Sequence, residues 1–134
     1  MQKQIEKKLI QEALSARTFA YAPYSGFTVG AALETISGKI YTGCNIENSA
    51  FSPTNCAERT AFFKAISEGF TEFTKIAIVG GKGEEMAAPA PCGVCRQVMA
   101  EFCCPATFEI IMARSVTDYE VCTLAELLPK GFAL

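Results

Sequence analysis

The chain has 134 residues, of which half are hydrophobic and 19% are charged, and its net charge is −2. This composition predicts one folded domain over residues 1–134 and excludes a disordered polymer. Basic residues gather only at Lys7-Lys8. We therefore expect a small-molecule partner and no nucleic acid.

Hydrophobic periodicity and turn residues divide the chain into helices and strands. In chain order, the pattern predicts a helix over residues 4–20, a hairpin of strands 27–33 and 39–43, a helix over 56–67, a strand over 75–79, a helix over 92–102, strands over 108–112 and 119–122, and a last short helix. Residues 44–54 and 80–91 are predicted loops. Thr123 and Glu126 have the spacing of a capping box for the last helix. Helices between strands favour parallel neighbours, so we expect one α/β domain with a mixed sheet.

Hydropathy and cysteine usage predict assembly and compartment. A mean hydropathy of +0.22 is high for a small monomer and favours self-association. The N-terminal residues are charged, and no apolar run reaches membrane-spanning length. We therefore expect a cytoplasmic protein with no membrane partner. Its seven cysteines should be reduced, because an odd number at uneven spacing argues against a disulfide framework.

Two cysteines stand three residues apart at the start of a predicted helix. Cys92 and Cys95 share one helical face, so both thiols can reach one metal ion. The positive end of the helix dipole favours their thiolates. Alone, this pair also fits half of a structural zinc site or a redox pair.

A second helix start favours a catalytic metal. Cys56 supplies a third thiol, and Glu58 follows two residues later. Three ligands with one open position are typical of catalytic zinc, whereas structural zinc has four. The chain has no histidine, so the general acid and base must be another group, and we predict Glu58. Three thiolates leave zinc with surplus negative charge, which Arg59 can offset by donating hydrogen bonds to the sulfurs. Spacing alone also fits a solvated arginine on the helix surface.

These motifs resemble the small cytidine deaminases of the homotetrameric type. The matching stretches are YAPYS (residues 21–25), FTVGAA (27–32), GCNIEN (43–48), CAERTA (56–61), PCGVCRQV (91–98) and ELLP (126–129). The resemblance implies a single-domain, three-layer α/β/α cytidine-deaminase-like fold with a five-stranded mixed sheet. It also implies one Zn²⁺ per chain and hydrolysis of cytidine and deoxycytidine to uridine and deoxyuridine with release of ammonia, in pyrimidine salvage.

The same resemblance assigns substrate contacts. It implies that Asn45 and Glu47 bind the ribose, that Phe27 packs on the pyrimidine and that the Ala57 N–H meets the base edge. Phe132 resembles an aromatic residue that reaches the site of a neighbouring subunit in a homotetramer. Pattern alone would place Phe27 in the core and leave Glu47 as an ordinary loop carboxylate.

Two positions depart from the common family pattern. Phe51 stands where Tyr is usual, so any contact of that hydroxyl is lost. Ser49 stands where Ala is usual.

The sequence also leaves open three functions other than nucleoside deamination in pyrimidine salvage. A structural zinc module that binds partners would need Cys44 as a fourth ligand. A nucleic-acid-editing deaminase would need a basic channel with aromatic residues, and a nucleoside-antibiotic deaminase would need a changed sugar pocket. The remaining cysteines are expected to be small buried hydrophobes, and three phenylalanines are expected in the core. These residues are Cys44, Cys103, Cys104 and Cys122, with Phe62, Phe63 and Phe102.

Overall fold

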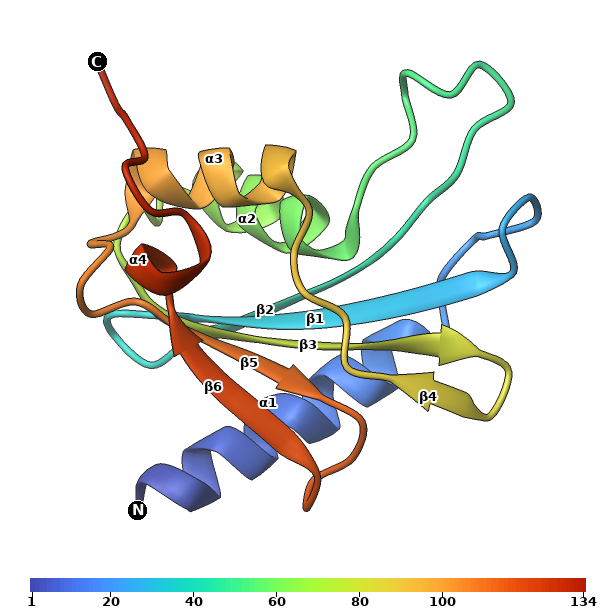
Figure 1. The fold of residues 1–134 in the computed structure, drawn as a ribbon, viewed down its shortest axis with the longest axis horizontal. Coiled ribbons are helices and arrows are strands. Elements are labelled where there is room, and N and C mark those ends of the chain that lie inside the picture. Colours follow the sequence, from blue (N-terminus) through green and yellow to red (C-terminus); the bar gives the residue numbers. More distant parts are fainter.

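The structure, a computed structural model, describes all residues 1–134 as four helices and six strands (Figure 1). The helices are α1 (Gln2–Arg17), α2 (Ala57–Ser67), α3 (Gly93–Phe102) and α4 (Leu124–Leu127). The strands are β1 (Phe27–Thr35), β2 (Ile40–Cys44), β3 (Phe73–Lys82), β4 (Glu85–Ala87), β5 (Glu109–Ala113) and β6 (Tyr119–Thr123). None of the helices combines the length and the apolar character that crossing a membrane requires.

The strands form one mixed sheet in the order β2-β1-β3-β5-β6. β3 and β5 run parallel, because α3 lies in the connection between them, and the other pairs are antiparallel. The predicted hairpin is β1 with β2, and Ala31 pairs with Gly43. The α/β class and the mixed sheet are therefore confirmed.

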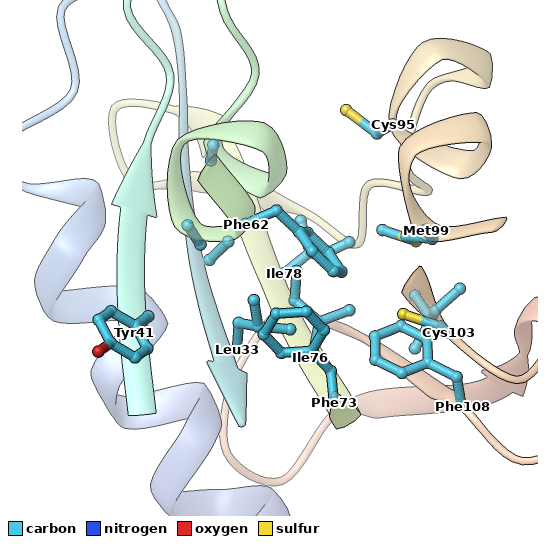
Figure 2. Close-up of a cluster of buried hydrophobic side chains, with 14 of the residues drawn as sticks. Leu33, Tyr41, Phe62, Phe73, Ile76, Ile78, Cys95, Met99, Cys103 and Phe108 are labelled. Atoms are coloured by element: carbon cyan, nitrogen blue, oxygen red, sulfur yellow. The ribbon is translucent and has the colours of Figure 1, made fainter. Parts of the chain in front are cut away.

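Alternate residues of β3 serve two separate cores, one on each face of the sheet. Ile76 and Ile78 lie in a cluster beneath α2 and α3, whereas Ala77 and Val79 lie in a cluster beneath α1. Figure 1 shows α1 on one side of the sheet and the other helices on the opposite side. In Figure 2, Phe62 of α2 and other large side chains fill the first cluster. The predicted three layers are confirmed.

The expected number of five strands was wrong, because the sheet has six. β3 continues past the predicted end at residue 79, and β4 pairs with it inside the predicted 80–91 loop. A Cβ on Gly81 would lie 2.3 Å from the Glu85 carbonyl oxygen, so only glycine permits this approach. The chain then turns at Gly83, which has a φ of 58°.

Two predictions of burial were also wrong. Phe62 is buried as expected, but Phe63 is 48% exposed, because adjacent helix residues point about 100° apart. Phe102 packs at the margin of the core. Of the four cysteines expected to be buried, Cys103 is buried, Cys44 and Cys122 are half-buried, and Cys104 is exposed after α3 has ended. The capping box of Thr123 and Glu126 is present.

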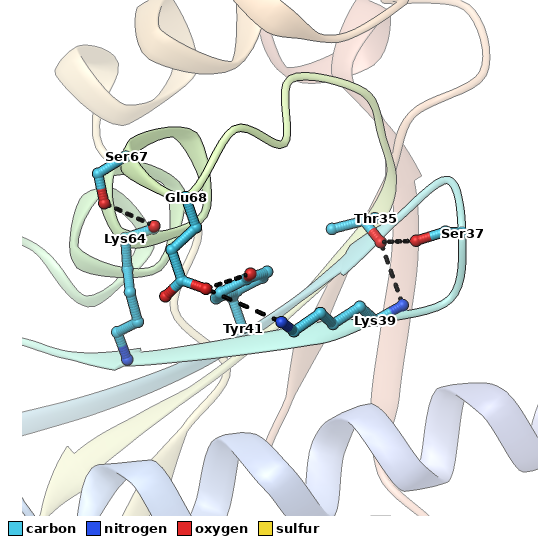
Figure 3. A network of polar contacts seen from close by, with 7 residues as sticks. All are labelled: Thr35, Ser37, Lys39, Tyr41, Lys64, Ser67 and Glu68. Carbon is cyan, nitrogen blue, oxygen red and sulfur yellow. Dashed lines mark hydrogen bonds and ion pairs between the residues drawn. The ribbon is translucent and has the colours of Figure 1, made fainter.

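Polar contacts fasten the C-terminal end of α2 to the edge strand β2 (Figure 3). Tyr41 Oη donates to Glu68 Oε1 at 2.8 Å, and Lys39 Nζ lies 3.8 Å from the same oxygen. Lys64 Nζ donates to the Thr42 carbonyl oxygen. These bonds fix the direction of α2, and with it the place where the helix begins.

The N-terminal end of α2 lies directly on the backbone of β2 at Gly43. A Cβ on Gly43 would lie 2.5 Å from the Ala57 carbonyl oxygen and 2.6 Å from the Ala61 nitrogen. Real Cβ atoms do not approach backbone so closely, so a side chain here must displace the helix. Gly43 therefore sets the position of the first turn of α2, which carries Glu58.

We expect Gly43→Ala to lower the free energy of unfolding by about 1–3 kcal/mol, as overpacking of a tight contact does. Urea unfolding followed by circular dichroism would measure it. Gly93→Ala is the matched control, since a Cβ there meets no atom within 4 Å. A Gly43→Ala protein as stable as the Gly93→Ala control would contradict this account of the helix position.

Candidate metal centre and its cavity

Three cysteine thiols meet where α2 and α3 begin. Cys56 Sγ lies 3.7 Å from Cys92 Sγ, which lies 3.4 Å from Cys95 Sγ. The three sulfurs lie within 4.8 Å of one another, and no other cysteine or carboxylate joins this group. Cys44 therefore supplies no fourth ligand, which removes the support for the structural zinc alternative.

Helix geometry explains how these thiols come together. Cys56 is the N-cap of α2 and Cys92 is the N-cap of α3, so both side chains stand at helix N-termini. The Cys95 N–H, in the first turn of α3, donates to Cys92 Sγ at 3.4 Å. Two converging helix dipoles favour negative charge on the sulfurs. The helices begin at Ala57 and Gly93, each one residue after the start predicted from the sequence.

Charge in the cluster is shared unequally. A hydrogen bond from the Cys95 thiol, together with one from Arg59, lowers the pKa of Cys56. The same contact with Cys56, helped by burial, raises the pKa of Cys95. One thiolate is thus already favoured before any metal binds. Soft thiolates are ligands that zinc prefers.

Arg59 supplies positive charge to the cluster. Its Nη2 donates to Cys56 Sγ at 3.2 Å. Its Nε is the only buried side-chain nitrogen or oxygen without a hydrogen-bond partner. A guanidinium that donates to one thiol of the cluster and has an unpaired N–H left over fits the net negative charge of a zinc ion carrying three thiolates. The residues present therefore fit zinc.

Glu58 is the one carboxylate buried beside the cluster. Its side chain is 4% exposed and follows Ala57, the first residue of α2. Burial raises the pKa of Glu58 to about 7. A group that titrates near neutral pH can both accept and release a proton, which general acid–base catalysis requires.

A cavity of about 370 Å³ opens beside Glu58 and the thiols. Val29 of β1 and Ile78 of β3 are among its apolar lining residues. The full lining comprises Ser25, Phe27, Val29, Asn45, Glu47, Thr54, Asn55, Cys56, Ala57, Glu58, Ile78, Pro89, Ala90 and Cys92. A cavity of this size, mainly apolar with a few polar groups, is typical of small-molecule sites.

Asn45 and Glu47 line the cavity, and both also hold the loops around it. Asn45 Oδ1 accepts from the Val29 N–H at 2.8 Å, and its Nδ2 donates to the Phe27 carbonyl oxygen at 2.8 Å. Glu47 accepts from Ser25 Oγ and from two backbone N–H groups, those of Tyr24 and Ser25. The Ser25 hydroxyl, more than any other contact, lowers the pKa of Glu47.

The predicted base-binding residues, Phe27 and Ala57, both line the cavity. Phe27 begins β1, and a Cβ on Gly80 would lie 3.1 Å from Phe27 Cε2 and 3.1 Å from Pro89 Cγ. Gly80 thus leaves room for the phenyl ring. Ala57, at the start of α2, has an N–H without a partner inside the helix.

Residues 3–111 match the family described as the cytidine and deoxycytidylate deaminase zinc-binding region. The chain belongs to this deaminase family. It is 51% identical to a cytidine deaminase of Sporosarcina psychrophila over 95% of this chain and 90% of the relative. It is 48% identical to a cytidine deaminase of Halalkalibacterium halodurans over 92% of this chain and 91% of the relative. A crystal structure of cytidine deaminase from Burkholderia pseudomallei superposes with a TM-score of 0.84 at 47% identity, covering 93% of this chain and 97% of that one.

Some residues of this deaminase-family chain lie outside the cavity. Phe132 is 68% exposed and lines a different pocket beside α4, where its carbonyl oxygen accepts from Gln97 Nε2 at 3.0 Å. Phe51 is exposed in the loop between β2 and α2, with a φ of 64°, and Ser49 is exposed near it. Within one chain, neither Phe51 nor Ser49, the two residues that depart from the family pattern, belongs to the thiol cluster.

Several lining residues of the deaminase cavity were not predicted from the sequence. Thr54 and Pro89 were predicted only as parts of loops, and Asn55 only as the residue before a helix. Ser25 stood in a matching stretch but was given no role. A serine two residues before Phe27, with Gly26 between them, is a signal for a side-chain turn that could have indicated it.

We expect Arg59→Ala to retain zinc in excess metal but to lower zinc affinity or deaminase activity about 10–100-fold, as loss of an outer hydrogen-bond partner does. The reason is that Cys56 Sγ loses its cationic donor. Competition with a chelator would measure the affinity. Arg114→Ala is the control, since Arg114 pairs with Asp118 in the β5–β6 turn. Unchanged affinity and activity in Arg59→Ala would reject the role.

Proposed function

We propose that this chain hydrolyses cytidine and deoxycytidine to uridine and deoxyuridine, releasing ammonia. The observation that carries the proposal is that the buried Glu58 and two thiols of the three-thiol cluster line one nucleoside-sized cavity. Relatives that cover nearly the whole chain bear the name cytidine deaminase.

We propose that Cys56, Cys92 and Cys95 hold the zinc. When bound, zinc supplies a Lewis acid that makes a water molecule easier to deprotonate. Glu58 accepts a proton from that water and delivers it to N3 of the pyrimidine while the water oxygen bonds to C4. Glu58 then carries the proton of the new C4 hydroxyl to the amino nitrogen, and the C4–N bond breaks as the C4 carbonyl forms, so that ammonia leaves. One water is consumed, and the carboxylate is regenerated.

The cavity walls would hold the nucleoside in place for this transfer. Phe27 packs on the pyrimidine ring, and the backbone at Ala57 and Cys92 meets the edges of the base. Asn45 and Glu47 bind the sugar hydroxyls. A carboxylate offers about four lone-pair positions, so Glu47 retains acceptor capacity beyond its three loop contacts.

We propose that the enzyme acts as a homotetramer in the cytoplasm, within pyrimidine salvage. Large exposed apolar side chains, including Phe19, Phe51 and Phe132, support self-association. Phe132 lies outside its own cavity, which is consistent with a contact to a neighbour's site. Light scattering should give the mass of a tetramer, and a monomer would reject this assembly.

The substrate class can be tested by comparing deamination of cytidine, cytosine, CMP and single-stranded DNA. We expect the nucleoside to be the best substrate by kcat/KM. A main activity on single-stranded DNA would favour the nucleic-acid-editing alternative. A main activity on cytosine or CMP would reject the proposed sugar contacts.

A further inference from the structure

The hydroxyl of Ser25 lies between two groups that the proposed function assigns to nucleoside binding. It donates to Glu47 Oε2 at 2.5 Å. Ser25 Oγ also accepts a hydrogen bond from the Phe27 N–H at 3.0 Å. A serine hydroxyl has one proton and two lone pairs, so it can make both bonds at once. Ser25 therefore connects the carboxylate of Glu47 to the backbone of Phe27.

This connection is one half of a bracket around Phe27. The Phe27 carbonyl oxygen accepts from Asn45 Nδ2 at 2.8 Å, while its N–H is held by Ser25. Gly26 makes the approach possible, because its φ of 71° turns the chain between Ser25 and Phe27. Both predicted sugar-binding side chains thus hold the residue predicted to pack on the base, Asn45 directly and Glu47 through Ser25.

We propose that Ser25 is a positioning residue that sets the sugar-binding carboxylate of Glu47 and the base-packing ring of Phe27 as one unit. The inference rests on the proposed function for its kinetic part. Ser25 lines the same cavity as both groups, but it is neither the proton carrier nor one of the clustered thiols. Its effect therefore falls on substrate binding rather than on the chemical step.

Removal of the hydroxyl has two predictable consequences. Glu47 keeps the N–H bonds of Tyr24 and Ser25 at Oε1 but loses the donor at Oε2. Phe27 loses the acceptor for its N–H. The carboxylate and the ring are then free to move independently, while Glu58 keeps its place at the start of α2.

The kinetic test compares wild type with Ser25→Ala on two nucleosides. We expect KM for cytidine to rise about 10-fold or more, because the charged carboxylate of Glu47 loses a hydrogen-bond donor. We expect kcat to stay within about 2-fold of wild type. On 2′,3′-dideoxycytidine, which offers Glu47 no sugar hydroxyl, KM should rise less than about 3-fold. A fall in kcat with unchanged KM, or equal losses on both nucleosides, would overturn the inference.

Two variants separate positioning from general damage. Ser25→Thr keeps the hydroxyl and places the added methyl group at an exposed position, so it should restore KM. Ser115→Ala removes a hydroxyl that holds another turn through the N–H groups of Thr117 and Asp118, so it should leave KM unchanged. Zinc content should equal that of the wild type in Ser25→Ala, Ser25→Thr and Ser115→Ala. A Ser25→Thr enzyme as impaired as Ser25→Ala would contradict the role of the hydroxyl.

A double-mutant cycle with Glu47→Ala tests the connection itself. If Ser25 acts through Glu47, the Ser25→Ala change should add less than about 2-fold to KM once Glu47 is gone. Full additivity of the two changes would overturn the inference.

Amide hydrogen exchange gives a readout that does not depend on activity. The Phe27 N–H should exchange about tenfold faster in both Ser25→Ala and Glu47→Ala. The first change removes the Ser25 hydroxyl that accepts from this N–H, and the second removes the carboxylate that holds the hydroxyl in place. Unchanged exchange in Glu47→Ala would overturn the coupling. A wild-type enzyme inactive on cytidine would instead overturn the proposed function and the kinetic part, while the exchange result would still decide the coupling.

Discussion

Glu58→Gln should retain one zinc per chain and lower kcat for cytidine by about 10²–10⁴-fold. Glutamine keeps the shape of the buried side chain and leaves the three thiols in place, but it cannot take up and release a proton. Metal analysis by atomic absorption, together with steady-state kinetics on the same preparation, would measure both quantities.

Glu68→Gln is the matched control for this change, because Glu68 lies at the opposite end of α2 and bonds to Tyr41 outside the cavity. It should deaminate cytidine at close to the wild-type rate. If the Glu58→Gln enzyme with full zinc also did so, Glu58 would not be the proton carrier.

Cys92→Ala should lose zinc, and deaminase activity should be lost with it. Cys92 Sγ lies in contact with both other sulfurs, so its removal leaves two thiols on different helices. The fall in zinc affinity should exceed the roughly 10–100-fold expected for an outer partner such as Arg59. Chelator competition would place the two variants on one scale.

Cys104→Ala controls for the loss of any thiol, since Cys104 is exposed and takes no part in the cluster. It should bind one zinc per chain with wild-type affinity. A Cys92→Ala protein that still held one zinc per chain would remove Cys92 from the ligand set.

Local spacing predicted the thiol cluster, because helix geometry alone places Cys92 and Cys95 on one face. Cys56 could be added to the set because it also stands at a predicted helix start, two residues before Glu58. The capping box at Thr123 was predictable for the same reason, since the residues that make it are three positions apart.

Features that depend on tertiary contacts were not predictable. β4 forms because the backbone of Gly81 can approach Glu85, and the pattern of glycines and charges around it is typical of a loop. Phe63 and Cys104 are hydrophobic, yet their neighbours Phe62 and Cys103 occupy the core-facing positions. The two bonds of the Asn45 amide to β1 join segments that only the folded chain brings together.

A metal ion bound by the thiol cluster would also lower the conformational entropy of the unfolded chain. Cys56 and Cys92 are 36 positions apart, and the segment between them contains α2, β3 and β4. An ion held by all three sulfurs closes this segment into a loop and removes conformational entropy from the unfolded ensemble, as a disulfide does. Zinc held by these three sulfurs would act as a cross-link between the two helices, so the metal that supports the chemistry would also restrain the chain in a fold without disulfides.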